Sequence, residues 1–141
     1  MSTKALIRIL LADDFEPILT FVSSMLERQP GLQVIGVAHD GLEAVQKAED
    51  LRPDLIVLDI SLPKLNGIEA ARKIRIVSPR SIILFLSANS SPDIALEAIR
   101  TGARGYVIKA DAAEDLLVAV DAVLIGKRFI SHRFARYGLI R

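Results

Sequence analysis

The chain has 141 residues, of which 51% are hydrophobic and 25% charged, and its formal net charge at pH 7 is +1. This length favours one domain of ordinary size, and this apolar fraction supports one buried core, which excludes a disordered or fibrous chain. The sequence has no cysteine, which excludes a disulfide scaffold, thiolate-bound zinc and cysteine catalysis.

Short runs rich in Ile, Leu and Val predict five β-strands along the chain. They span residues 7–12, 32–38, 55–58, 82–86 and 106–108. The run at 55–58 is apolar at every position, which indicates a strand covered on both faces. Such strands are typical of a parallel sheet between two layers of helices.

Helical spacing of apolar residues alternates with these strands. The apolar residues from Ile18 to Leu26 recur at intervals of three and four, and residues 116–124 repeat the pattern before Gly126. Weaker patterns predict helices over residues 42–51, 66–77 and 93–101. The alternation predicts an α/β fold with an open, doubly wound, five-stranded parallel sheet.

Polar residues follow four of the five predicted strands. Asp13 and Asp14 follow the first strand, Asp59 the third, Ser87 the fourth and Lys109 the fifth. Ligand sites in open α/β sheets lie beyond the carboxyl ends of the strands, so we expect these side chains to converge. Converging carboxylates repel one another unless a cation lies among them, and their oxygens suit Mg²⁺. The pattern predicts a metal-assisted phosphoryl site with Asp59 as the central nucleophile.

Each of these residues also has an ordinary structural interpretation. Asp13 and Asp14 suit the N-cap of the following helix, and Asp59 suits a turn. A phosphatase of the haloacid dehalogenase type would need a second acid at position 61, where Ser61 stands. No glycine-rich loop follows the first strand, which argues against dinucleotide binding.

Four segments together resemble the receiver domain of two-component response regulators. They are ILLADD at residues 9–14, LDISLP at 58–63 with Gly67, LSA at 86–88 and GYVIK at 105–109. The resemblance covers roughly residues 6–126. It implies a flavodoxin-like, three-layer sandwich with the strand order 2-1-3-4-5.

The resemblance also implies a role for each acidic residue. Asp59 would accept a phosphoryl group from a sensor histidine kinase. Mg²⁺ would be bound by Asp13, Asp14, Asp59 and the backbone carbonyl of Ser61, with Asp13 acting largely through a coordinated water. The protein would not be an enzyme beyond self-phosphorylation from small donors and self-dephosphorylation.

A switch is implied by the same resemblance. Lys109 would pair with the phosphoryl oxygens, Ser87 would move toward them, and Tyr106 would change its packing in step. The surface that reports this change would be the fourth helix, the fifth strand and the fifth helix. Ser87 replaces the commoner threonine, and Ala110 follows Lys109 where many receivers have proline.

The last fifteen residues differ from the rest of the chain. Residues 1–126 contain 13 basic and 17 acidic residues, whereas residues 127–141 contain five basic residues, no acidic residue and interleaved aromatic side chains. We therefore predict a receiver domain over residues 1–126 and a basic linker over 127–141, in which Ser131 caps a short helix. The ending resembles the NarL/FixJ-type branch, whose members often carry a helix-turn-helix DNA-binding domain.

These features define the expected partners. We expect a sensor histidine kinase, and a homodimer through either the reporting surface or the first and fifth helices. DNA would be bound only through an output domain that lies outside this sequence. The alternative is a stand-alone receiver that acts by protein–protein interaction or in a phosphorelay. The sequence has no membrane-length apolar run and no signal-peptide pattern, so we expect a cytoplasmic protein without membrane contact.

Overall fold

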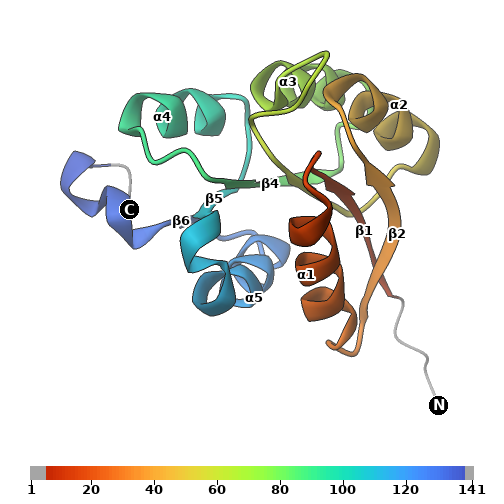
Figure 1. Ribbon diagram of the computed structural model, residues 1–141, viewed down its shortest axis with the longest axis horizontal. Helices are drawn as coiled ribbons and strands as arrows, with labels where there is room; N and C mark the ends of the chain where they lie inside the picture. Colours follow the sequence, from red (N-terminus) through yellow and green to blue (C-terminus); the bar gives the residue numbers. More distant parts are fainter. Residues whose placement is uncertain (1–5, 139–141) are drawn as a thin grey trace.

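A six-stranded parallel sheet forms the centre of the molecule in the computed structural model, which describes residues 6–138 (Figure 1). The strand order is β2-β1-β3-β4-β5-β6. The strands are β1 (Ile7–Ala12), β2 (Leu32–Ala38), β3 (Leu55–Leu58), β4 (Ile82–Ser87), β5 (Gly105–Ile108) and β6 (Phe129–Ile130). The predicted parallel α/β architecture and the order of its first five strands are confirmed.

Helices cover both faces of this sheet. They are α1 (Glu16–Glu27), α2 (Gly41–Leu51), α3 (Gly67–Val77), α4 (Pro92–Arg100) and α5 (Ala112–Leu124), with short 3-10 helices η1 (Lys109–Asp111) and η2 (His132–Tyr137). Helices α1 and α5 pack on one face, and α2, α3 and α4 pack on the other (Figure 1). No helix within residues 6–138 is long and apolar enough to cross a membrane.

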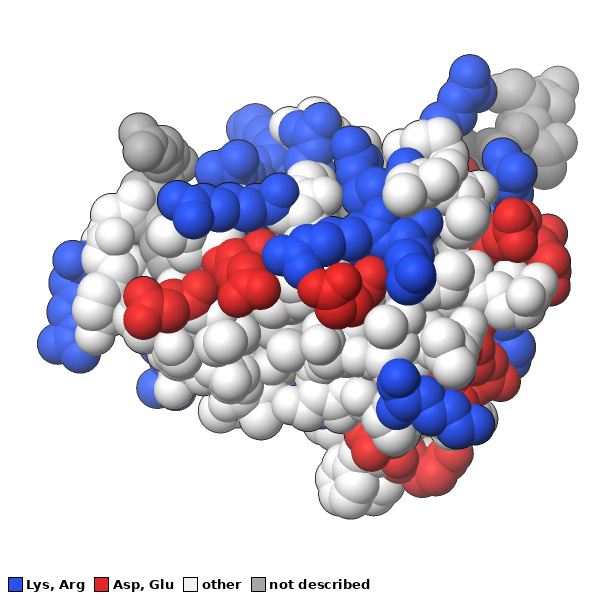
Figure 2. Space-filling model, turned by 90° about the horizontal axis from the view of Figure 1, so that it is seen from above, with Lys and Arg blue, Asp and Glu red and all other residues white. Residues whose placement is uncertain are grey.

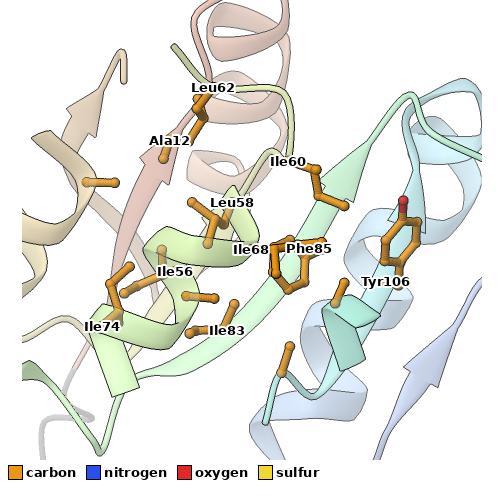
Figure 3. Close-up of a cluster of buried hydrophobic side chains, with 14 of the residues drawn as sticks. Ala12, Ile56, Leu58, Ile60, Leu62, Ile68, Ile74, Ile83, Phe85 and Tyr106 are labelled. Carbon is orange, nitrogen blue, oxygen red and sulfur yellow. The ribbon is translucent and has the colours of Figure 1, made fainter. Parts of the chain in front are cut away.

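The two faces of the sheet bury separate hydrophobic clusters. Leu10, Ile56 and Ile83 point toward α2, α3 and α4, in the cluster shown in Figure 3, whereas Ile9 and Leu55 point toward α1 and α5. Successive side chains of a strand point to opposite faces. Burial on both faces therefore explains why β3 is apolar at every position and why the other strands are rich in apolar residues.

The prediction of five strands is wrong, because a sixth strand pairs with β5. The Phe129 amide donates to the Arg104 carbonyl at 3.1 Å, and the Ser131 amide donates to the Tyr106 carbonyl at 2.9 Å. β6 has only two residues, which is too few for an alternating apolar pattern to be recognised in a sequence. The segment predicted as a linker thus begins against the sheet, while the division of the chain at residue 126 remains a prediction.

Two predicted helix caps differ in the structure. Asp13 Oδ1 accepts a hydrogen bond from the Phe15 amide at 2.9 Å, while the N-cap residue of α1 is Phe15, which makes no side-chain capping bond. Ser131 occupies the N-cap position of η2 without a side-chain capping bond, and its buried hydroxyl has no partner in the described part of the chain. These polar residues therefore do not cap the helices that follow them.

Basic side chains gather on the layer of α2, α3 and α4, seen from above in Figure 2. Arg72, Lys73 and Arg75 of α3 and Arg100 of α4 are exposed there. Arg72 is paired with Glu69 and Glu97. Positive charge is therefore not confined to the C-terminal segment, although residues 1–126 carry more acidic than basic groups.

Candidate functional site

The sequence-predicted site residues meet at the carboxyl ends of β1, β3, β4 and β5. Asp13 and Asp59 are each 4% exposed and Ser87 is fully buried, whereas the Lys109 side chain is 17% exposed. Asp14, which follows Asp13, is exposed. The parallel topology places these strand ends at one edge of the sheet, as the sequence predicted.

Lys109 bridges the two buried carboxylates. Its Nζ atom lies 2.7 Å from Asp13 Oδ2 and 3.3 Å from Asp59 Oδ2. Burial raises the pKa of Asp59, and the charge of Asp13 raises it further, while Lys109 opposes both effects. Burial alone would lower the pKa of Lys109, but its contacts with Asp13 and Asp59 outweigh burial and raise it. The ammonium group therefore offsets the repulsion between two carboxylates that the fold brings together.

Asp13, Asp14 and Asp59 also form a group suited to a metal ion. Each offers one carboxylate oxygen, and these oxygens lie within 4.8 Å of one another. Two of the carboxylates are buried and the third faces solvent, so the group is accessible from outside. Clustered carboxylate oxygens are typical ligands of hard divalent cations, and the donor set therefore fits such an ion.

Asp59 is held by the backbone on both sides. Its amide donates to the Ala12 carbonyl at 2.9 Å, and its Oδ1 accepts from the Ile60 amide at 2.8 Å. The first residue of α3, Gly67, packs directly on this turn: a Cβ atom there would lie 1.9 Å from the Asp59 carbonyl oxygen. Only glycine allows this close approach. Ser61 is exposed nearby, and metal binding by its carbonyl remains a prediction.

Ser87 and Tyr106 are connected through one residue of the β4–α4 loop. Ser87 Oγ accepts from the Asn89 amide at 3.0 Å, and the Tyr106 hydroxyl donates to the Asn89 carbonyl at 2.7 Å. Tyr106 is fully buried beside Phe85 at the edge of the cluster in Figure 3. Burial raises the pKa of its hydroxyl, with the nearby Ser87 opposing the shift. Tyr106 thus lies in an inward position, linked to the loop that carries Ser87.

Sequence reasoning missed one aromatic contact of this region. Phe134 is 1% exposed, and its ring meets that of Tyr106 edge to face, with centroids 5.5 Å apart. The residue lies in a segment rich in Lys and Arg, which is typical of a solvated linker. The available signal was the recurrence of apolar residues at Phe129, Ile130 and Phe134.

A family model for the response regulator receiver domain matches residues 9–121. This chain belongs to that family. Among curated relatives of this receiver, GacA of Pseudomonas viridiflava is 31% identical over 131 residues, and NarL of Escherichia coli K12 is 34% identical over 131 residues. Each alignment covers 93% of the receiver and 61% of the relative. The chain therefore spans about three fifths of the length of these curated relatives.

Solved structures agree with the family. A LuxR-family response regulator from Aurantimonas sp. SI85-9A1 aligns with a TM-score of 0.88 and 35% identity, covering 94% of both chains. The isolated receiver of RcsB from Salmonella enterica serovar Typhimurium, solved with phosphomimetic BeF3⁻, aligns with a TM-score of 0.86 and 25% identity, covering 93% of this receiver and 97% of that chain. The predicted NarL/FixJ-type resemblance is confirmed.

Proposed function

We propose that Asp59 accepts a phosphoryl group from the phosphohistidine of a sensor histidine kinase, in a reaction that requires Mg²⁺. The observation that carries this proposal is the buried Asp59 carboxylate on β3, which shares Lys109 with Asp13 and a potential metal group with Asp13 and Asp14. A structural acid would not need to be buried beside a second acid. Perturbed carboxylates of this kind are typical of functional sites.

The residues of the chain support an in-line transfer. The new bond joins an Asp59 carboxylate oxygen to phosphorus, the phosphorus–nitrogen bond breaks, and the histidine leaves with its electron pair. Lys109, which contacts Asp59 Oδ2, keeps this carboxylate ionised and then pairs with a phosphoryl oxygen. The Ser87 hydroxyl donates to another phosphoryl oxygen. Mg²⁺ held by Asp13, Asp14, Asp59 and the Ser61 carbonyl would neutralise charge on the phosphoryl group.

The output of this receiver is proposed from its relatives. A matched RcsB structure is described as bound to a promoter, and another as two RcsB dimers bound to two DNAs. We infer that phosphorylation controls transcription through a DNA-binding domain beyond this sequence, in the cytoplasm. The alternative is a stand-alone receiver that acts by protein–protein interaction or as a phosphorelay intermediate.

A homodimer through α1 and α5 agrees better with the structure than one through α4, β5 and α5. The open edge of β5 is already paired with β6. Large apolar side chains are exposed on the layer formed by α1 and α5, including Phe21 of α1 and Val118 of α5. These helices lie in the same layer (Figure 1), so their exposed residues offer a surface for a second copy.

The direct test is incubation with Mg²⁺ and acetyl phosphate, followed by intact-mass measurement. We expect the wild type to gain the mass of one phosphoryl group, and Asp59→Asn or excess EDTA to abolish the gain. Asp54→Asn, which changes an exposed acid at the opposite end of the sheet, is the matched control and should gain the same mass. A retained gain in Asp59→Asn, or none in the wild type, would refute the proposal.

A further inference from the structure

The switch residue Tyr106 is enclosed in part by a segment that follows the last helix of the domain. Its ring is 0% exposed between Phe85 of β4 and Phe134 of η2. Phe134 belongs to residues 129–137, which we name the clasp. We propose that the clasp is the surface element that reads the position of Tyr106, and that the docked clasp and a phosphorylated Asp59 stabilise each other. The coupling rests on the proposed function of Asp59.

The clasp is paired with β5 at Gly105 and Tyr106. In the strand pairing, Gly105 lies opposite Phe129 and Tyr106 lies opposite Ile130. The amide of Phe129 donates to the carbonyl of Arg104, just before β5, and the amide of Ser131 donates to the carbonyl of Tyr106. The backbone that carries the Tyr106 ring is therefore also the backbone on which the clasp is docked.

Side chains attach the clasp at two further places. Arg133 donates two hydrogen bonds to the Asp111 carboxylate, from Nε to Oδ2 at 2.6 Å and from a second nitrogen to Oδ1 at 2.9 Å. Asp111 follows Lys109 by two residues in η1. At the far end of the clasp, Tyr137 lines a groove with Pro92 and Leu96 of α4. The clasp thus contacts η1 and β5, and it faces α4 across this groove.

Both routes from the phosphorylation site lead to these contacts. On one side Ser87 binds Asn89, which binds the Tyr106 hydroxyl. On the other side Lys109 binds Asp59 and begins the 3-10 turn that holds Arg133. A phosphoryl group that attracts the Ser87 hydroxyl and the Lys109 ammonium acts on both routes together.

The packing of the two rings supplies the coupling. Because Tyr106 is fully enclosed, its outward rotation requires Phe134 to move or leaves a void beside it. Packed interiors tolerate such voids poorly, so the two rings adopt matched positions. Coupling between two sites is reciprocal: if phosphorylation favours the inward Tyr106 and thereby the docked clasp, the docked clasp must favour phosphorylation equally.

The occupant of this surface is therefore the chain itself. On the surface expected to report the switch to a partner, β5 is covered in this structure by β6 and Phe134, and Tyr137 faces α4 across a groove. Arg133 also supplies the charge that complements Asp111. A partner at this surface would have to displace the clasp or bind to it.

The test measures hydrogen exchange of the Phe129 and Ser131 amides in the full 141-residue chain. Exchange is compared without ligand and with Mg²⁺, beryllium and fluoride, while ¹⁹F NMR reports bound beryllofluoride independently. We expect bound beryllofluoride to slow exchange at both amides by about fivefold or more, the lower end of typical coupling between sites. Asp59→Asn should remove the effect.

Clasp variants test the reverse direction. Phe134→Ala should weaken beryllofluoride binding by about fivefold or more, and Arg133→Gln, which leaves the buried rings intact, should weaken it less. Ile76→Ala, at an exposed apolar residue of α3, is the control and should bind like the wild type.

The outcomes separate the two proposals. Bound beryllofluoride with unchanged exchange at both amides, or unchanged binding by both clasp variants, would overturn the coupling and leave the role of Asp59 intact. A wild type that binds no beryllofluoride and gains no mass from acetyl phosphate would refute the role of Asp59 and the coupling with it. If Phe134→Ala fails to fold, Arg133→Gln and the wild-type exchange data decide.

Discussion

The two ends of the sheet differ in how their polar groups are partnered. At the amino end, the Arg8 guanidinium donates to the Leu51 and Arg52 carbonyls at 2.7 and 3.0 Å. There the Ser81 hydroxyl donates to the Pro53 carbonyl at 2.6 Å. Each of these donors has an acceptor within hydrogen-bond distance, and each bond joins segments that lie far apart in the chain. This end is built to hold strands and helices together.

The carboxyl end instead brings like charges together. Asp13 and Asp59 are buried with one shared cation, Lys109, and the pKa of Asp59 is raised. Polar groups are paired with complementary partners at the amino end of the sheet, whereas two acids share one cation at the carboxyl end. Such an arrangement is expected where a protein performs its function, so the contrast supports the proposal that the carboxyl end carries the functional site.

Removing the shared cation should give the largest change in stability. Lys109→Met leaves two buried carboxylates without a counter-charge, and we expect the free energy of unfolding without metal to fall by about 3 kcal/mol. Mg²⁺ should restore part of this loss, because it replaces the missing charge. Urea unfolding with and without Mg²⁺ measures both effects. Lys73→Met, at an exposed lysine of α3, is the control, and an equal loss there would argue against the bridge.

A change at the amino end should affect stability alone. Ser81→Ala leaves the Pro53 carbonyl and the Ser78 hydroxyl without their present partner, and we expect a loss of about 1.5 kcal/mol. The variant should still gain one phosphoryl group from acetyl phosphate, as intact mass will show. A loss of phosphorylation in a folded Ser81→Ala protein would contradict the claim that the amino end contributes to stability alone.

Neutralising Asp59 should stabilise the metal-free protein. Because the pKa of Asp59 is raised in the folded state, the stability this group contributes is complete below its ordinary pKa of 3.8 and is lost as the pH rises through the raised value. The free energy of unfolding of Asp59→Asn at pH 7 should therefore exceed that of the wild type by about 1 kcal/mol. The advantage should shrink toward pH 4. Thermal unfolding in EDTA across this range measures it, and an advantage independent of pH would contradict the explanation.

The smallest effect on stability is expected at the exposed acid of the same end. Asp14→Asn should change the free energy of unfolding by less than about 0.5 kcal/mol, because Asp14 is exposed. Its Mg²⁺ affinity should nevertheless fall by about tenfold or more, as for other losses at a metal site. Calorimetric titration with Mg²⁺ checks the affinity, and unchanged affinity would remove Asp14 from the ligand set.

Most of the fold could be predicted because its signals are local. The runs at 7–12, 32–38 and 55–58 coincide with β1, β2 and β3, since strands packed between layers of helices are rich in Ile, Leu and Val. One of the helices with a weaker pattern, α4, was placed one residue too late at each end. β6 was missed because its position depends on pairing with β5, which a two-residue segment does not reveal.

The sequence predicted which residues come together at the site, but not which of their side chains contact one another. Strand ends in a parallel sheet had to bring Asp13, Asp59 and Lys109 together, whatever the details of packing. That Lys109 contacts both acids depends on rotamers, and the meeting of Phe134 with Tyr106 depends on how the chain returns after α5. The order of residues along the chain carries no direct signal for the Lys109 contacts, and for the Phe134 contact it offers only the recurrence of apolar residues at Phe129, Ile130 and Phe134.

The short strand β6 also protects the edge of the sheet. Without it, the carbonyls of Arg104 and Tyr106 would lose the amides of Phe129 and Ser131, and β5 would be an open edge of apolar residues. Unpaired edges of this kind recruit other chains and promote aggregation. A shortened protein that ends at Gly126 should therefore self-associate through β5, even if its phosphorylation site is intact.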